Sequence, residues 1–215
     1  MSLKSWKDVT ASEFGEFLRG LPGPLAPRDS AYLLFLLLGR LTTAEGFGET
    51  EPTWVFSPHR FGDALDRLTP TRRKAAEACA ARIVGWHASA DLPPTWNHEG
   101  EVAVAFLGAG FDPARLADEL TTLPPTPAAA WMLADLVTTV AAHSGGLSLG
   151  RAIDRAFRGL DEGAASKATV ALDRVYRTPS TLAVLEAGAL GADDRVAEAA
   201  SDAHAWVERY VGGPS

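Results

Sequence analysis

Several things that this sequence lacks restrict its class. It contains one cysteine, Cys79, so a single chain can build neither a disulfide framework nor a thiolate metal cluster. Its longest apolar run, residues 31–38, is much shorter than the roughly 20 residues that a membrane-spanning helix needs. The amino terminus has no succession of cationic, apolar and small residues typical of a signal peptide. We therefore expect a folded cytoplasmic protein with no membrane partner.

The familiar motifs of catalysis are also missing. The sequence has no P-loop, no G-x-G-x-x-G after a predicted strand, no H-E-x-x-H and no G-x-S-x-G. It also lacks the Glu-x-x-His pairs of di-iron helix bundles. We therefore predict no cofactor and no metal site, assign no catalytic residue, and leave open whether the protein is an enzyme.

The charge balance argues against nucleic acid as a partner. Lysine and arginine total 20 against 27 acidic residues, a net charge of -7, whereas non-specific nucleic-acid affinity comes mostly from basic side chains. Arg151, Arg155 and Arg158 form a basic cluster, but Asp154 lies among them. The 47% content of hydrophobic residues is typical of a folded protein.

Proline-containing joints separate the Ala- and Leu-rich stretches, at residues 51–54, 92–96 and 123–127. Because proline lacks an amide hydrogen and disfavours helix in the residue before it, each joint ends one helix and orients the next. The pattern predicts an all-α protein of about ten helices in antiparallel hairpins. Either a compact multi-helical domain or an irregular stack of helical repeats, of the HEAT or TPR kind, would produce it.

We expect one domain over residues 1–215. Residues 1–26 form an amino-terminal helix and linker, in which Thr10 and Glu13 have capping-box spacing. Residues 42–56 form a long loop, and residues 212–215 a frayed tail.

Other patterns predict individual helices. The Leu-rich helix that ends near Leu41 is apolar nearly all round, so we place it centrally. A helix starting at Ser57 carries Leu65 and Leu68 inward, and His87 lies on the inward stripe of the next helix as a hydrogen-bonded core residue. Arg73 and Glu77 pair on the outer face of that helix, at four-residue spacing.

Later helices show start signals. Asp112, Thr126 and Thr178 each precede a proline, which is the arrangement of a helix cap and first turn. Residues 101–107 alternate weakly enough to allow a strand, but we predict a helix there.

The first candidate site is the aromatic end of the long loop with the helix start behind it, which contains Trp54, Phe56, His59, Arg60 and Asp63. Exposed amides and the positive dipole end of a helix could hold an anion beside these side chains. The alternative, which we weight more heavily, is a solvated first turn under a packed tryptophan.

The second candidate contains Trp96, His98, Glu99 and Glu101. An imidazole beside carboxylates could bind a metal or act as a general acid and base. The spacing fits no known ligand motif, because adjacent helical residues point to different sides. We therefore favour a capped helix start with charged residues in its first turn.

The third candidate is a polar stripe on the helix over residues 128–143, made by Asp135, Thr138, Thr139 and His143. Asp135 and Thr139 lie one turn apart and His143 lies one turn further, so the carboxylate could reach a hydroxyl or orient an imidazole from the next turn. The stripe is a binding or catalytic site if it faces a pocket. It is the wet side of the helix if it faces water, which is the interpretation we favour.

Two classes of function remain. The leading hypothesis is a protein-binding module of regulatory or immunity type, because Trp54 and Trp96 occupy equivalent joints and tryptophan carries much of the energy at interfaces. The helix from Ala128 through Trp131 to His143 could alternatively supply a homodimer face. The rival is a cofactor-independent enzyme or small-ligand protein with a pocket between helices, lined by Trp54, His59, Arg60, Asp135 and His143.

Overall fold

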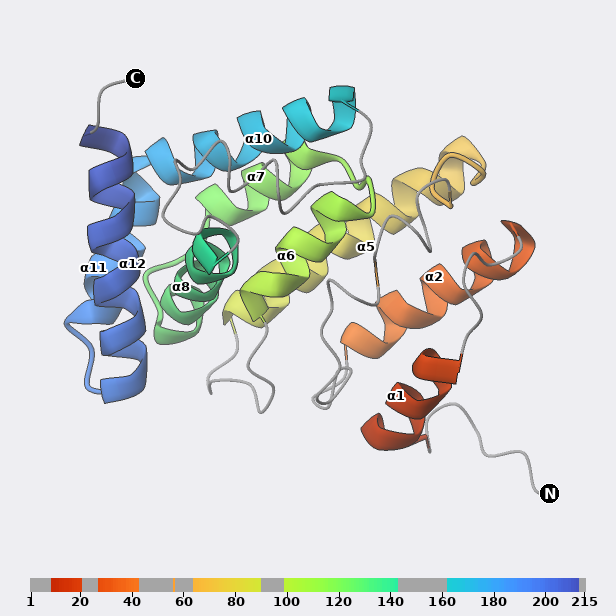
Figure 1. Ribbon diagram of the computed structural model, residues 1–215, viewed down its shortest axis with the longest axis horizontal. Coiled ribbons are helices and arrows are strands. Elements are labelled where there is room, and N and C mark those ends of the chain that lie inside the picture. The colour runs from red at the N-terminus through yellow and green to blue at the C-terminus, as the bar shows by residue number, and fades with distance from the viewer. Residues whose placement is uncertain are drawn as a thin grey trace.

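The computed structural model describes residues 9–20, 27–42, 56, 64–89, 99–142 and 162–212. In these ranges it contains nine α-helices and no strand, which confirms the all-α prediction (Figure 1). The helices are α1 (Ala11–Gly20), α2 (Pro27–Leu41), α5 (Pro70–Ser89), α6 (Glu99–Gly108), α7 (Pro113–Thr121), α8 (Pro127–Ala142), α10 (Glu162–Arg177), α11 (Pro179–Ala189) and α12 (Asp194–Gly212).

Most of the predicted start signals act as helix caps, but Thr178 does not cap α11, because its hydroxyl donates to the carbonyl oxygen of Arg174. The Glu13 amide donates to Thr10 Oγ1 at 3.3 Å, and the Thr10 amide donates to Glu13 Oε2 at 3.0 Å, so the capping box is formed. Asp112 accepts from the amide of Ala114 at 3.0 Å and caps α7. Residues 101–107 belong to α6 and are therefore helical, as predicted.

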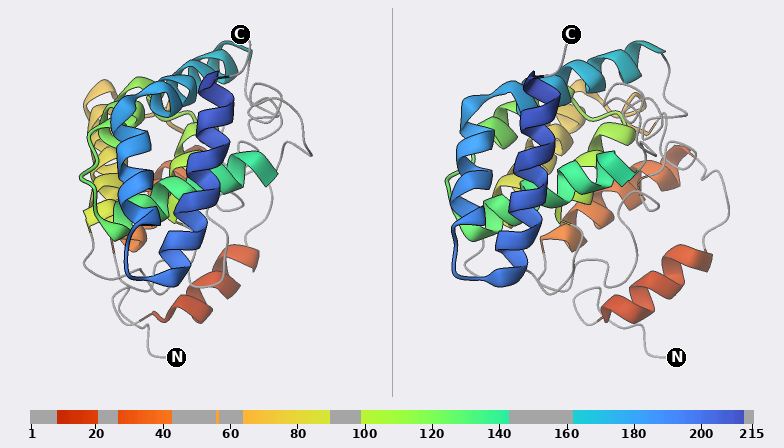
Figure 2. Two further views of the ribbon diagram at one scale, coloured as in Figure 1. Left: turned by 90° about the vertical axis from the view of Figure 1, so that its left-hand side faces the viewer. Right: turned by 60° about the vertical axis from the view of Figure 1, so that its left-hand side comes forward.

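Helix α8 is the centre of the arrangement. It packs against α5, α6, α11 and α12, and crosses the direction of the α11–α12 hairpin (Figures 1 and 2). Helix α7 lies between α5 and α10. The hairpin expectation holds for α11 and α12, whereas α6 packs mainly on α8 and little on its chain neighbour α7.

Two helix backbones come very close where α6 begins against α8. A Cβ atom on Gly100 would lie 2.1 Å from the backbone nitrogen of Leu136 and 2.6 Å from the carbonyl oxygen of Met132. Beside it, Asp135 Oδ2 accepts from the amides of Gly100 at 2.9 Å and Glu101 at 3.3 Å. The first amides of α6 are thus capped by a side chain of another helix.

The rest of α6 is buried along its length, from Val102 to Leu107. Its partner α8 presents many alanines to the core, which keep side-chain volume low and let helices approach closely. A second close contact supports this pattern, since a Cβ on Gly188 of α11 would lie 2.3 Å from Ala130 Cβ of α8.

The expectation that the Leu-rich helix is central was wrong. Helix α2 lies at the edge of the molecule beside α5 (Figure 1). Its leucines, such as Leu34 and Leu37, are fully buried, but Tyr32 and Phe35 are 73% and 41% exposed. The apolar surface of α2 extends around the helix, yet only the leucine face is covered.

The region before α5 also differs from the prediction. Residues 64–68 form turns, not the end of a helix, although Leu65 and Leu68 are buried as expected. Of the predicted long loop only Thr42 and Phe56 are described, and the buried Phe56 ring packs edge-on against Phe106 with centroids 5.3 Å apart. The predicted linker up to residue 26 and the last tail residues, 213–215, lie outside the described ranges.

None of the described helices combines the length and the apolarity that crossing a bilayer requires.

The α6–α8 contact makes a direct prediction for Gly100. Replacing Gly100 by alanine should lower the free energy of unfolding by about 3 kcal/mol, because the added methyl group meets rigid backbone atoms. Gly39 on α2 is the matched control, since a Cβ added there would have no atom within 4 Å. Gly39→Ala should be neutral or stabilise by up to about 1 kcal/mol. Urea unfolding measures both, and equal midpoints for the two variants would contradict the contact.

Candidate functional site

The structure describes six of the candidate site residues: Phe56, Glu99, Glu101, Asp135, Thr138 and Thr139. Glu99 and Glu101 lie in the first turn of α6, and Glu101 is buried there. The other candidates lie outside the described ranges, and their proposed roles stay predictions: Trp54, His59, Arg60, Asp63, Trp96, His98 and His143.

The structure places Asp135 at the amino end of α6, where its carboxylate accepts two backbone amides. Its neighbours on the predicted stripe differ in surroundings, since Thr138 is exposed and Thr139 half-buried. Asp135 is absent from the described lining of the hollows discussed below. The observed role of Asp135 is therefore to hold the start of α6 against α8.

A hollow of about 710 Å³ lies between α2 and the turn before α5, and we call it the aromatic groove. Tyr32 and Phe35 are three residues apart, so they share the helix face opposite the buried leucines. Arg67 and Arg72 bring positive charge to the other side of the groove. The described lining consists of Ala31, Tyr32, Phe35, Arg67, Leu68, Thr69 and Arg72.

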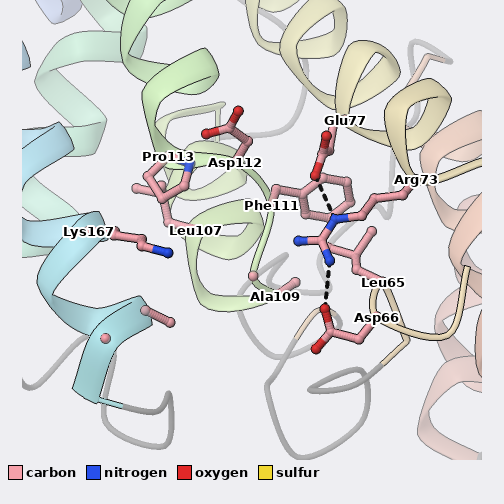
Figure 3. A pocket seen from close by; sticks show the side chains of 13 residues that line it. Leu65, Asp66, Arg73, Glu77, Leu107, Ala109, Phe111, Asp112, Pro113 and Lys167 are labelled. Carbon is pink, nitrogen blue, oxygen red and sulfur yellow. Dashed lines mark hydrogen bonds and ion pairs between the residues drawn. The ribbon is translucent and has the colours of Figure 1, made fainter. Parts of the chain in front are cut away.

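A second hollow, of about 480 Å³, is the Arg73 cavity (Figure 3). The cavity adjoins the aromatic groove along the chain. Asp66 and Arg73 line the cavity, whereas their neighbours Arg67 and Arg72 line the groove. The described lining of the cavity is Leu65, Asp66, Arg73, Glu77, Leu107, Ala109, Gly110, Phe111, Asp112, Pro113, Gly163, Ala164 and Lys167.

Two carboxylates fix the guanidinium of Arg73. Its Nε donates to Glu77 Oε1 at 2.9 Å, which confirms the predicted pairing on α5, and its Nη1 donates to Asp66 Oδ1 at 2.6 Å. The hydrogen bond to Glu77 is the main reason that the pKa of Arg73 is raised above its ordinary value, with Asp66 adding to it. Because Arg73 and Asp66 are well exposed to solvent, these pairs orient the side chain more than they stabilise the fold.

His87 is a structural residue, as predicted. It is buried, and its Nε2–H donates to the carbonyl oxygen of Leu41 at 3.1 Å, which joins α5 to the end of α2. Burial lowers the pKa of His87 to about 4, because the charged imidazolium would lose its hydration, and the hydrogen bond to Leu41 offsets only part of this.

Another polar cluster joins α10 to α12. The Tyr210 hydroxyl and Arg177 Nε both donate to Asp173 Oδ1, and the Arg177 guanidinium lies 5.1 Å from the centre of the Tyr210 ring. Partial burial opposes ionisation of Asp173, but the hydrogen bonds from Tyr210 and Arg177 outweigh it and lower the pKa of the carboxyl. We assign this cluster to packing of the two helices.

Among the described residues, no group of three or more His, Cys, Asp or Glu side chains is arranged to hold a metal ion. No protein-family model matches the chain, and neither a curated protein nor a solved structure is detectably similar to it. The aromatic groove and the Arg73 cavity are the features of the described residues from which we propose function below.

The residues that make these hollows were not among the sequence-based candidates. Tyr32 and Phe35 are the only aromatic residues in a leucine-rich helix, and their three-residue spacing was the signal that they share a face. Lys167 of α10 had no comparable signal, because its relation to Arg73 exists only after α10 packs on α7 and α7 packs on α5.

The environment of His87 predicts an acid-sensitive fold. Between about pH 6.5 and about pH 4 the unfolded chain binds a proton at this residue and the folded chain does not, so stability falls as the pH is lowered. The wild type should lose about 3 kcal/mol from this residue over that range. In a His87→Gln variant the side-chain amide can still donate to Leu41 but does not titrate. The fall in the free energy of unfolding between the two pH values should therefore be about 3 kcal/mol smaller than in the wild type. Urea unfolding at the two pH values measures the difference, and parallel pH profiles would refute this account of His87.

Proposed function

We propose that this protein is a protein-binding module and that the aromatic groove on α2 is its docking surface. The observation that carries the proposal is the pair of exposed rings beside an arginine-bearing wall. This retains the class favoured by the sequence and assigns the contact to described residues.

The exposure of the two rings supports binding. Single exposed apolar side chains are ordinary in folded proteins, but Tyr32 and Phe35 share one hollow and one helix face. Tyrosine and arginine are enriched among the few residues that supply most binding energy at interfaces, and both occur here. Burying these rings under a partner removes apolar surface from water, which favours association.

The charge of the groove indicates the partner. Arg67 and Arg72 are the charged residues of its described lining, which contains no carboxylate, in a chain whose net charge is -7. A complementary partner carries carboxylates at the rim and an apolar side chain for the space between Tyr32 and Leu68. We therefore infer an acidic segment with one apolar or aromatic anchor.

The enzyme hypothesis has less support. It requires several of the predicted polar residues to converge on one pocket, and the only described member, Asp135, is engaged at the start of α6. A homodimer through α8 also lacks support, because the buried residues of that helix already face α6, α11 and α12.

Selection of peptides from a random displayed library on the purified protein tests this proposal. We expect enriched sequences with an apolar residue flanked by Asp or Glu. Tyr32→Ser should weaken their binding by about 30-fold, as for removal of an interface hot spot. Arg72→Glu reverses a charge at the rim, and salt screens such charges. This substitution should therefore weaken binding more at low salt than at high salt.

Leu190→Ser is the control, since Leu190 is 81% exposed but follows α11, away from the groove. It should leave peptide affinity unchanged. Enrichment of basic peptides, or equal loss of affinity in the Leu190 and Tyr32 variants, would exclude the groove as an acidic-segment site.

A further inference from the structure

The Arg73 cavity is lined by different residues from the aromatic groove and includes both cations and carboxylates. Four described segments surround it: the turn at residues 64–68, the start of α5, the turn from α6 to α7, and the start of α10 (Figure 3). Its volume of about 480 Å³ lies in the range of small-molecule sites.

Two cationic side chains enter this space from opposite walls. Arg73 uses Nε and Nη1 for its carboxylate partners, which leaves the Nη2 group on the side that faces the cavity (Figure 3). Lys167 extends from α10 toward the same space, and its ammonium group has no ion-pair partner among the residues that the structure describes. Both groups therefore have hydrogen-bond donors to offer a ligand.

The guanidinium is also preorganised. Because Glu77 and Asp66 hold Arg73 in place, little side-chain freedom is lost when Nη2 binds a ligand. The helices α7 and α10 begin at this cavity and add the positive ends of their dipoles.

Carboxylates in the lining of the Arg73 cavity also disfavour ligands with more than one negative charge. Asp66, Glu77 and Asp112 contribute three carboxylates against the two cations, so a doubly charged ligand meets more repulsion than a singly charged one. The remaining lining residues are mostly apolar, and Leu65, Leu107 and Phe111 meet the cavity with only the edges of otherwise buried side chains, which offer a hydrocarbon group a small contact.

We propose that the Arg73 cavity binds a small organic monocarboxylate. The carboxylate lies between Arg73 and Lys167, and its aromatic or aliphatic body packs against Leu65, Leu107 and Phe111. This site is separate from the aromatic groove, and its occupancy does not depend on the docking proposal.

Titration of the full chain with phenylacetate, followed by calorimetry and by the backbone amide signal of Gly110, tests the site. We expect saturable binding that shifts Gly110, because this residue lines the cavity. Phenylacetamide has the same body without the charge and should bind at least about tenfold more weakly, since charge-assisted hydrogen bonds are the stronger ones. Lys167→Gln should weaken phenylacetate binding by about tenfold or more.

Lys74→Gln is the matched control, because Lys74 is an exposed lysine that follows Arg73 on α5 but is not in the described lining. It should bind phenylacetate as the wild type does. Tighter binding of inorganic phosphate than of phenylacetate would overturn the monocarboxylate assignment. Absence of phenylacetate binding, or equal effects of the two lysine variants, would overturn the site itself.

Discussion

The seating of α6 on α8 is the contact on which the rest of the structure depends. Gly100 allows the two backbones to approach, and Asp135 satisfies the first amides of α6 from the side of α8. Because this end of α6 is buried, amides left there without a hydrogen-bond acceptor would destabilise the fold. The Asp135 carboxylate supplies that acceptor and so removes the cost. The apolar residues 102–107 can then lie wholly in the core.

This contact also explains the edges of the molecule. Because α6 and α8 occupy the centre, α2 is left with one face on α5 and the other open, which forms the aromatic groove. The end of α6 leads through Phe111 into α7, and this turn forms part of the Arg73 cavity. Both hollows share the segment before α5 and the first turn of α5, where the neighbouring Arg72 and Arg73 line different hollows.

How far the sequence predicts such a structure depends on the range of the interaction. The helix starts at Thr10 and Asp112 were predictable, because a cap and its amide are neighbours in the chain. The edge position of α2 was not, since its leucine content is equally typical of a central helix and burial depends on what covers each face. Asp135 is conspicuous as a polar residue on an apolar helix, but its partner Gly100 lies 35 residues away and no local pattern links the two. The same limit hid the relation between Arg73 and Lys167.

Native-state hydrogen exchange tests the central role of the α6–α8 contact most directly. If this contact organises the core, amides of residues 102–107 and of the facing part of α8 exchange only when the whole chain unfolds. Their exchange free energies then equal the free energy of unfolding from urea denaturation. Exchange of α6 through a local opening of much lower free energy, while α11 and α12 stay protected, would contradict the account.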